Sequence, residues 1–278
     1  MGFSTLKMAA ALFVAGLCAF AHGQGAAIDI DGARQSYGRT LTVTPSDRTV
    51  TITKDKIIIA PKKEDVTYTI SGYFNGQIVS RTKNTVLKFN NAFIENDKGL
   101  PAVHCEAKTE ISTTAGTVNY VVSSGESKEK TAAIHGRKDM ALGGSGTLYA
   151  VGRVYHGIKA DDVKIKGSGT FYLQGTDKGS ALNCRSLTVE KDKTFKAYFL
   201  NSKNGVKADD GILIQSGNFF MQNLGTAFKT DTKEDDPKTS HFIRISGGTV
   251  AASGVERLYR TDDGACAVSV AVVGEKGQ

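Results

Sequence analysis

The feature that most constrains the fold of this chain is a phrase that returns at a fixed spacing. The stretch "GIKADDVKI" (157–165) returns as "GVKADDGILI" (205–214), and related stretches lie before and between them. Aligned by their first apolar residue, at Ile134, Ile158, Leu182 and Val206, these stretches follow one another at steps of about 24 residues. Such a constant period is typical of a structural unit that buries its apolar face only against its own copies.

A second phrase keeps the same period and indicates β-strands. It reads "GTLYAVG" from Gly146, "GTFYLQG" from Gly169, "KTFKAYF" from Lys193, "GNFFMQN" from Gly217 and "GTVAASG" from Gly248. Gly, Asn and Asp separate short runs of β-branched and aromatic residues, without helical periodicity. Strand pairing would place successive units about 4.8 Å apart. The sequence therefore predicts an all-β chain folded as a parallel β-helix (solenoid) with coils of about 24 residues.

Alternation along these strands predicts which side chains face the core, because successive strand residues point to opposite sides. The two expected inward rows are Leu148, Phe171, Phe195, Phe219 and Val250, and Ala150, Leu173, Ala197, Met221 and Ala252. Cys105 and Cys184 share a small inward position in coils too far apart for a disulfide. Once Cys18 near the N-terminus is set aside, these two and Cys266 make three cysteines, an odd number, and their spacing matches no zinc or redox motif.

The first residues have the pattern of an export signal. One lysine precedes an apolar run at 8–20, and small residues at Ala21 and Gly23 suit cleavage before Gln24. We expect residues 1–23 to be a signal peptide, so that the protein works in the periplasm, at the cell surface or outside the cell. An uncleaved anchor and a lipid anchor at Cys18 are the alternatives, and we expect no membrane-spanning segment after cleavage.

The rest of the chain is expected to form one domain, residues 24–278. Its repeats are clearest over 100–255, with strands or a cap at 26–66 and a last strand or cap at 256–278. The net charge of +7 indicates attraction to polyanions such as acidic polysaccharides. No nucleophile elbow, phosphate loop or nucleotide fingerprint is present. We expect no nucleic acid partner and a monomer.

Several phrases together resemble a known family. They are "TYTISGYFNGQIV" (67–79), "TVLKFNNAFIENDKGLPAV" (85–103), "GSGTLYA" (144–150), "GSGTF" (167–171) and the two phrases of the first paragraph. They resemble the bacterial carbohydrate-binding domain-containing proteins first recognised in a clostridial cell-surface protein, over roughly residues 40 to 255. The resemblance implies a right-handed parallel β-helix, binding of polysaccharides such as cellulose or polygalacturonate, and bound calcium, without an established enzymatic activity.

The paired aspartates of the repeated phrase are candidate calcium ligands, because calcium takes six to eight oxygen ligands. They are Asp161, Asp162, Asp209 and Asp210. The expected register places Arg185 between the two pairs and Asp231 beyond them. A ladder of alternating charge, or hydrogen bonds to the turn backbone, would then explain the aspartates without a metal.

A row of outward side chains is the candidate carbohydrate-binding site: Tyr149, Tyr172, Lys196 and Phe220. Aromatic faces could stack on sugar rings, and the lysine could meet an acidic group, although such residues are also ordinary on strands. The sequence thus predicts an exported, non-catalytic protein that binds polysaccharide, with a preference for acidic polymers. One alternative is a pectate-type lyase, with Lys159 or Lys207 as the base. The other is a structural or adhesive surface protein that binds host or matrix components.

Overall fold

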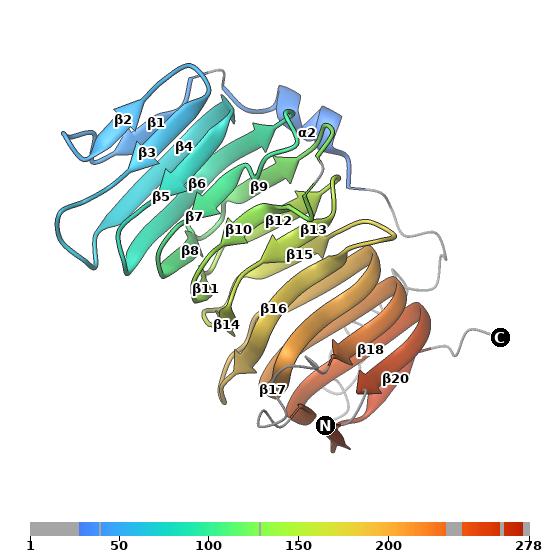
Figure 1. Ribbon diagram of the computed structural model, residues 1–278. Coiled ribbons are helices and arrows are strands. Elements are labelled where there is room, and N and C mark those ends of the chain that lie inside the picture. The colour runs from blue at the N-terminus through green and yellow to red at the C-terminus, as the bar shows by residue number, and fades with distance from the viewer. Residues whose placement is uncertain (1–27, 39, 128, 232–240, 262–263, 275–278) are drawn as a thin grey trace, which may run out of the picture.

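The computed structural model describes residues 28–38, 40–127, 129–231, 241–261 and 264–274. The predicted signal peptide and most of the acidic stretch "DTKEDDP" (231–237) lie outside these ranges. The molecule is elongated, with β1 to β4 at one end and β18 and β20 at the other (Figure 1). Within the described residues, no helix has the length and apolar character needed to cross a membrane.

One helix and twenty strands make up the described chain. The helix is α2 (Ile30–Gln35), and the early strands are β1 (Thr42–Thr44), β2 (Val50–Ile52), β3 (Lys56–Ile59), β4 (Thr67–Asn75), β5 (Gln77–Ser80), β6 (Thr85–Asn96), β7 (Val103–Cys105), β8 (Thr109–Thr113), β9 (Val118–Ser123), β10 (Ala132–Gly136) and β11 (Met140–Gly144). The later strands are β12 (Thr147–Gly152), β13 (His156–Lys159), β14 (Asp162–Ile165), β15 (Thr170–Gln174), β16 (Ser180–Val189), β17 (Lys196–Thr230), β18 (Phe242–Thr261), β19 (Ala265–Val268) and β20 (Val272–Gly274).

The repeated phrase forms neighbouring parallel strands, as its period predicts. Ile134 of β10 pairs with Ile158 of β13, Ile158 with Leu182 of β16, and Leu182 with Val206 of β17. These strands, with β5 and β7, form what we call the basic face. The second half of β6, with β9, β12, β15 and part of β17, forms the aromatic face. The first half of β6, with β8, β11, β14 and the second half of β16, forms the third face.

The inward side chains of all three faces meet in one apolar core. Every residue of the two predicted inward rows is buried, and Phe171, Phe195 and Phe219 are completely inaccessible to solvent. Burying one such side chain stabilises the fold by roughly 1.5–3 kcal/mol. Cys105 and Cys184 are buried, free thiols, as predicted, whereas Cys266 is a free and exposed thiol. The alternation in the sequence therefore correctly separated core from surface.

The predicted register is wrong in one coil. Phe171 pairs with Ala197 and Leu173 pairs with Phe199, whereas Phe195 precedes the start of β17. The chain is therefore displaced by two residues relative to the expected alignment. A shift of two leaves every side chain on its own side of the sheet, because the side-chain period of a strand is also two.

The predicted architecture also needs correction. The all-β class is confirmed, but the described strands belong to one sheet that closes around a single core, with extra strands at its ends. This is a closed, barrel-like and mainly parallel β structure, and the prediction of an open right-handed β-helix solenoid is wrong. Nor are its units uniform, because Val103 pairs with Ile134 across a longer connection, and β17 and β18 run through their corners as continuous strands.

The N-terminal end is closed by local structure that the period does not describe. β1 pairs with β4, and β2 pairs with β3, both antiparallel. Helix α2 begins after Asp29, whose Oδ1 accepts a hydrogen bond of 2.8 Å from the backbone N–H of Gly32. This capping interaction satisfies one of the free N–H groups of the first turn. The antiparallel strands pair with the edge of the parallel sheet, whereas Ile30 of α2 packs beside Phe93 and Val122 on the aromatic face.

Candidate carbohydrate-binding faces

The outward row of the aromatic face is a stack of rings. Tyr149 and Tyr172 are parallel within 7°, with ring centroids 4.4 Å apart. The next ring is Tyr198, 4.5 Å from Tyr172, and Phe220 lies 4.4 Å from Tyr198. Three of the four predicted row members are therefore together. Lys196 is exposed and pairs with Thr170 instead, which follows from the two-residue shift.

Because these rings are stacked, the face of each ring contacts the face of its neighbour. Each interior ring presents its edge and polar tip to solvent, rather than a face on which a sugar ring could lie. Burial raises the pKa of the phenols of Tyr149, Tyr172 and Tyr198, so the hydroxyls stay protonated. Mutual stacking of this kind contributes about 0.5–1.5 kcal/mol per pair to stability. The aromatic row is thus well explained as a stabilising feature of the sheet.

Part of the same row is covered by the chain itself. Phe93 precedes Tyr120 and Tyr149 in the row and is completely buried, in a cluster that includes Ile30 of α2 and the partly buried Tyr37. The Tyr37 hydroxyl donates a hydrogen bond of 2.6 Å to the carbonyl oxygen of Val118. The N-terminal segment therefore occupies one end of the aromatic face, and only the other end remains accessible.

The outward row of the basic face has a different character. Five strands contribute to it, and β17 contributes two residues; the six residues, which we call the basic row, are His104, His135, Lys159, Asn183, Lys207 and Lys229. The last two lysines are held together by Asp231, whose carboxylate oxygens lie 2.7 Å from Lys207 Nζ and 2.6 Å from Lys229 Nζ. Lys229 is also paired in register with Arg260 of β18.

The signal for the basic row was present in the sequence. Its first five members each directly follow the apolar residue that defines the repeated phrase, as in "VH", "IH", "IK", "LN" and "VK". The candidate site proposed from sequence followed the aromatic phrase instead, because the notion of sugar stacking favoured aromatic residues. The residues that directly follow the first apolar residue of the repeated phrase, such as Lys159 and Lys207, would have identified a cationic row.

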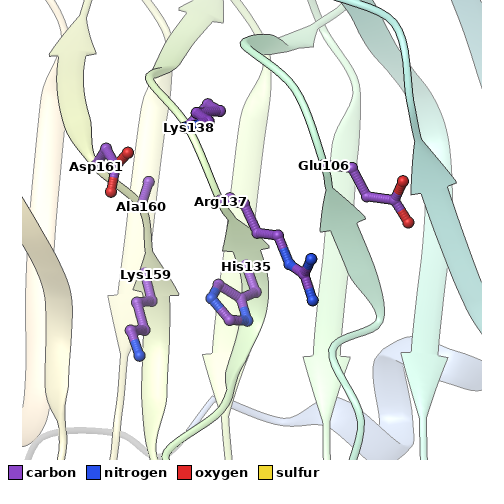
Figure 2. A pocket seen from close by; sticks show the side chains of 8 residues that line it. Glu106, His135, Arg137, Lys138, Lys159, Ala160 and Asp161 are labelled. Atoms are coloured by element: carbon purple, nitrogen blue, oxygen red, sulfur yellow. The ribbon is translucent and has the colours of Figure 1, made fainter.

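A shallow hollow of about 530 Å³ opens on the basic face. It is lined by Glu106, His135, Gly136, Arg137, Lys138, Lys159, Ala160 and Asp161. The side chains of His135 and Lys159 extend from neighbouring strands, and the Arg137 side chain lies between His135 and Glu106 (Figure 2). Among the described residues, no ion pair engages Arg137 or Lys159, whereas Glu106 Oε2 lies 3.3 Å from Arg81 Nε. The hollow therefore offers uncompensated cations to a ligand.

The histidines of the basic row are kept neutral by their surroundings. Burial, followed by the charges of Lys159 and nearby groups, lowers the pKa of His135 to about 4. Burial and then the Arg137 charge also lower the pKa of His104. The two rings are 5.4 Å apart, edge to face. At neutral pH the basic row therefore carries its charge on lysines, with two uncharged imidazoles at one end.

The aspartate corners form ion pairs. Arg185 forms an ion pair with Asp162, and its Nη1 lies 4.0 Å from Asp210 Oδ2. The Ser186 hydroxyl donates a second hydrogen bond of 2.7 Å to Asp162. This is the alternating ladder considered from the sequence, although its carboxylates are Asp162 and Asp210 rather than Asp161, Asp209 and Asp231.

The prediction of calcium at these corners gains no support from the geometry. Asp161 lines the hollow, and the Asp209 carbonyl oxygen lies 2.6 Å from His241 Nδ1. Across the part of the chain that the structure describes, no three His, Cys, Asp or Glu side chains come together as a metal site would require. An arginine between the two aspartate pairs supplies the positive charge that a cation would otherwise provide.

The fold and these two faces define a class: an all-β protein whose closed sheet presents long outward rows of aromatic and of cationic residues. Comparison with known families then identifies the group. The model of the family described as carbohydrate-binding domain-containing protein matches residues 46–183 and again 160–273. The chain belongs to this family.

A solved structure supports the fold assignment. A polysaccharide lyase-like protein from C. thermocellum, determined as a gadolinium derivative, superposes with a TM-score of 0.52 at 18% sequence identity. The match covers 83% of this chain and 92% of that one. At this identity the likeness concerns the fold alone. No curated protein matched the chain.

Proposed function

We propose that this protein is an exported, non-catalytic polysaccharide-binding protein that prefers acidic polymers, and that the basic face is its binding surface. Family membership supports a carbohydrate ligand. We assign binding to the basic face because of the basic row, in which neighbouring strands present outward polar or cationic side chains.

The spacing of the row suits a linear polymer. Neighbouring strands lie about 4.8 Å apart, which is close to the length of one sugar unit, so a chain lying across the strands would meet a new side chain with each unit. Lysines and arginines on an exposed surface attract polyanions over a distance of about 8–10 Å at ordinary salt. The hollow at Arg137 and Lys159 would then receive an acidic substituent.

The aromatic face is the weaker candidate for sugar contacts. Its ring faces contact one another, and helix α2 covers the part of the row around Phe93. Its exposed edges and hydroxyls could still donate hydrogen bonds, but they carry no charge that would select an acidic polymer. We therefore assign the preference for acidic polysaccharide to the basic face.

Affinity electrophoresis of residues 24–278 through gels containing polygalacturonate, dextran sulfate or hydroxyethyl cellulose tests the proposal. We expect the two anionic polymers to retard the protein and the neutral one not to. The double variant Arg137→Gln with Lys159→Gln should lose most of the retardation, because each exposed charge contributes up to about 1 kcal/mol, or about fivefold in affinity.

Lys164→Gln combined with Lys166→Gln is the matched control. Lys164 lies 3.7 Å from Glu190 and Lys166 2.6 Å from Glu110, both on the third face, so the pair removes two positive charges without touching the basic face. Equal losses in the control and in the double variant would refute a localised site. Release of unsaturated sugar from polygalacturonate would instead favour a lyase, and binding to matrix proteins without any glycan binding would favour an adhesin.

A further inference from the structure

The two histidines of the basic row differ from the buried histidine of the neighbouring strand. His104 and His135 are paired in register on β7 and β10 and are only partly buried. His104 Nδ1 is buried and has no hydrogen-bond partner among the described residues. His156 on β13 is buried, and its Nδ1 accepts a hydrogen bond of 3.0 Å from the Ser180 backbone N–H. Of these three histidines, His156 is the one whose neutral form is fixed by a hydrogen bond within the described residues.

Burial is the main cause of the low pKa of both histidines, and the charged groups around the pair add to it. From β3 comes Lys56, from the end of β5 Arg81, from β13 Lys159, and from the turn after β10 Arg137 and Lys138. The opposing carboxylates are Glu106, which is paired with Arg81, and Asp161 at the rim of the hollow. Positive charge is thus in excess, and it disfavours a further positive charge on either ring.

We infer that the His104–His135 pair is a proton-coupled subsite for one anionic group, a sulfate or a carboxylate, of the bound polysaccharide. The inference rests on the proposed binding function of the basic face. A bound anion offsets the charges of Arg137 and Lys159 and attracts a positive charge, so it opposes the effect of burial that keeps the imidazoles neutral. One ring then takes a proton from solvent and becomes an imidazolium beside the anion, so the complex holds one more proton than the free protein.

Linkage makes this coupling reciprocal. If the anion favours the protonated ring, then acidification must favour binding of the anion by the same factor. The effect covers the interval between the ordinary pKa of histidine, 6.5, and the value of about 4 to which His135 is lowered. Between pH 7.5 and pH 5 we expect affinity to rise about tenfold for one coupled proton.

Calorimetric titration with dextran sulfate tests the inference, because sulfate esters stay charged across this range and cannot themselves account for a pH effect. Titrations at pH 5.5 in two buffers of different ionisation enthalpy count the protons taken up on binding. We expect close to one proton for the wild-type protein, and affinity about tenfold higher at pH 5 than at pH 7.5.

The double variant His104→Gln with His135→Gln should lose both the proton uptake and the rise in affinity between pH 7.5 and pH 5, each measured against its own affinity at pH 7.5. His156→Asn, which removes a histidine from the neighbouring strand, should keep both. Thermal unfolding confirms that each variant is folded, and the single variants His104→Gln and His135→Gln serve if the double variant is not.

The outcomes separate the inference from the proposed function. Binding at pH 7.5 without proton uptake would overturn the inference and leave the polysaccharide-binding proposal intact. Undiminished proton uptake in the histidine variants would also overturn it, since other groups would then be the source. Failure of dextran sulfate and polygalacturonate to bind at either pH would overturn the proposed function, and the inference with it.

Discussion

Acid should destabilise this protein through His156, and the structure gives the size of the effect. The His156 side chain is only 6% exposed, and its Nδ1 accepts the Ser180 backbone N–H. Burial, together with the charges of Lys159 and Lys207, lowers its pKa to about 3. Charging this ring requires a proton on Nδ1, which would break the hydrogen bond and place a cation inside the fold.

The sign follows from the direction of the shift. The unfolded chain binds a proton on this histidine below about pH 6.5, whereas the folded protein resists it down to about pH 3. Stability contributed by the neutral ring is therefore fully present above pH 6.5 and is lost as the pH falls toward 3. At about 1.4 kcal/mol per pH unit within this window, the loss between pH 7 and pH 5 is about 2 kcal/mol.

Urea unfolding of the wild-type protein and of His156→Asn at pH 7 and pH 5 measures this contribution. Asparagine keeps a side-chain acceptor near the position of Nδ1 but does not titrate. We expect the variant to lose about 2 kcal/mol less than the wild type between the two pH values, since all other titrating groups are shared. Equal losses in the two proteins would show that His156 is not the buried neutral group described here.

Three further substitutions probe the fold. Phe219→Ala removes a completely buried ring and should lower the free energy of unfolding by about 3–5 kcal/mol, measured by urea denaturation; a loss below about 1 kcal/mol would contradict the core packing. Tyr172→Ala should cost about 1–3 kcal/mol through lost stacking while leaving polygalacturonate retardation unchanged, and a loss of retardation would return the binding site to the aromatic face. Gly144→Ala should lower the melting temperature, because Gly144 has φ +86° and an added Cβ would lie 2.2 Å from the Thr113 carbonyl oxygen; an unchanged melting temperature would refute the close approach.

The aspartate corners and the aromatic row show which features of the candidate sites the sequence could predict and which it could not. The repeated phrase placed Arg185 between two aspartate pairs, and the structure confirms an ion-pair ladder there. Which carboxylates it contacts depends on side-chain direction at the corner, and the sequence chose Asp161 and Asp209 where the structure has Asp162 and Asp210. The aromatic row was located, but not the fact that its rings stack face to face, since that depends on the rotamers of residues on neighbouring strands.

The sequence by itself determined that the chain is all-β, which strands become neighbours, and which side chains point inward. A fixed period aligns Ile134, Ile158 and Leu182, and alternation separates core from surface, because both are one-dimensional patterns. Only the tertiary structure decided the two-residue shift that replaces Lys196 with Tyr198, since a shift of two preserves every inward and outward assignment. It alone also decided how the sheet closes and where helix α2 lies, because closure depends on hydrogen-bond register and packing across segments that share no sequence pattern.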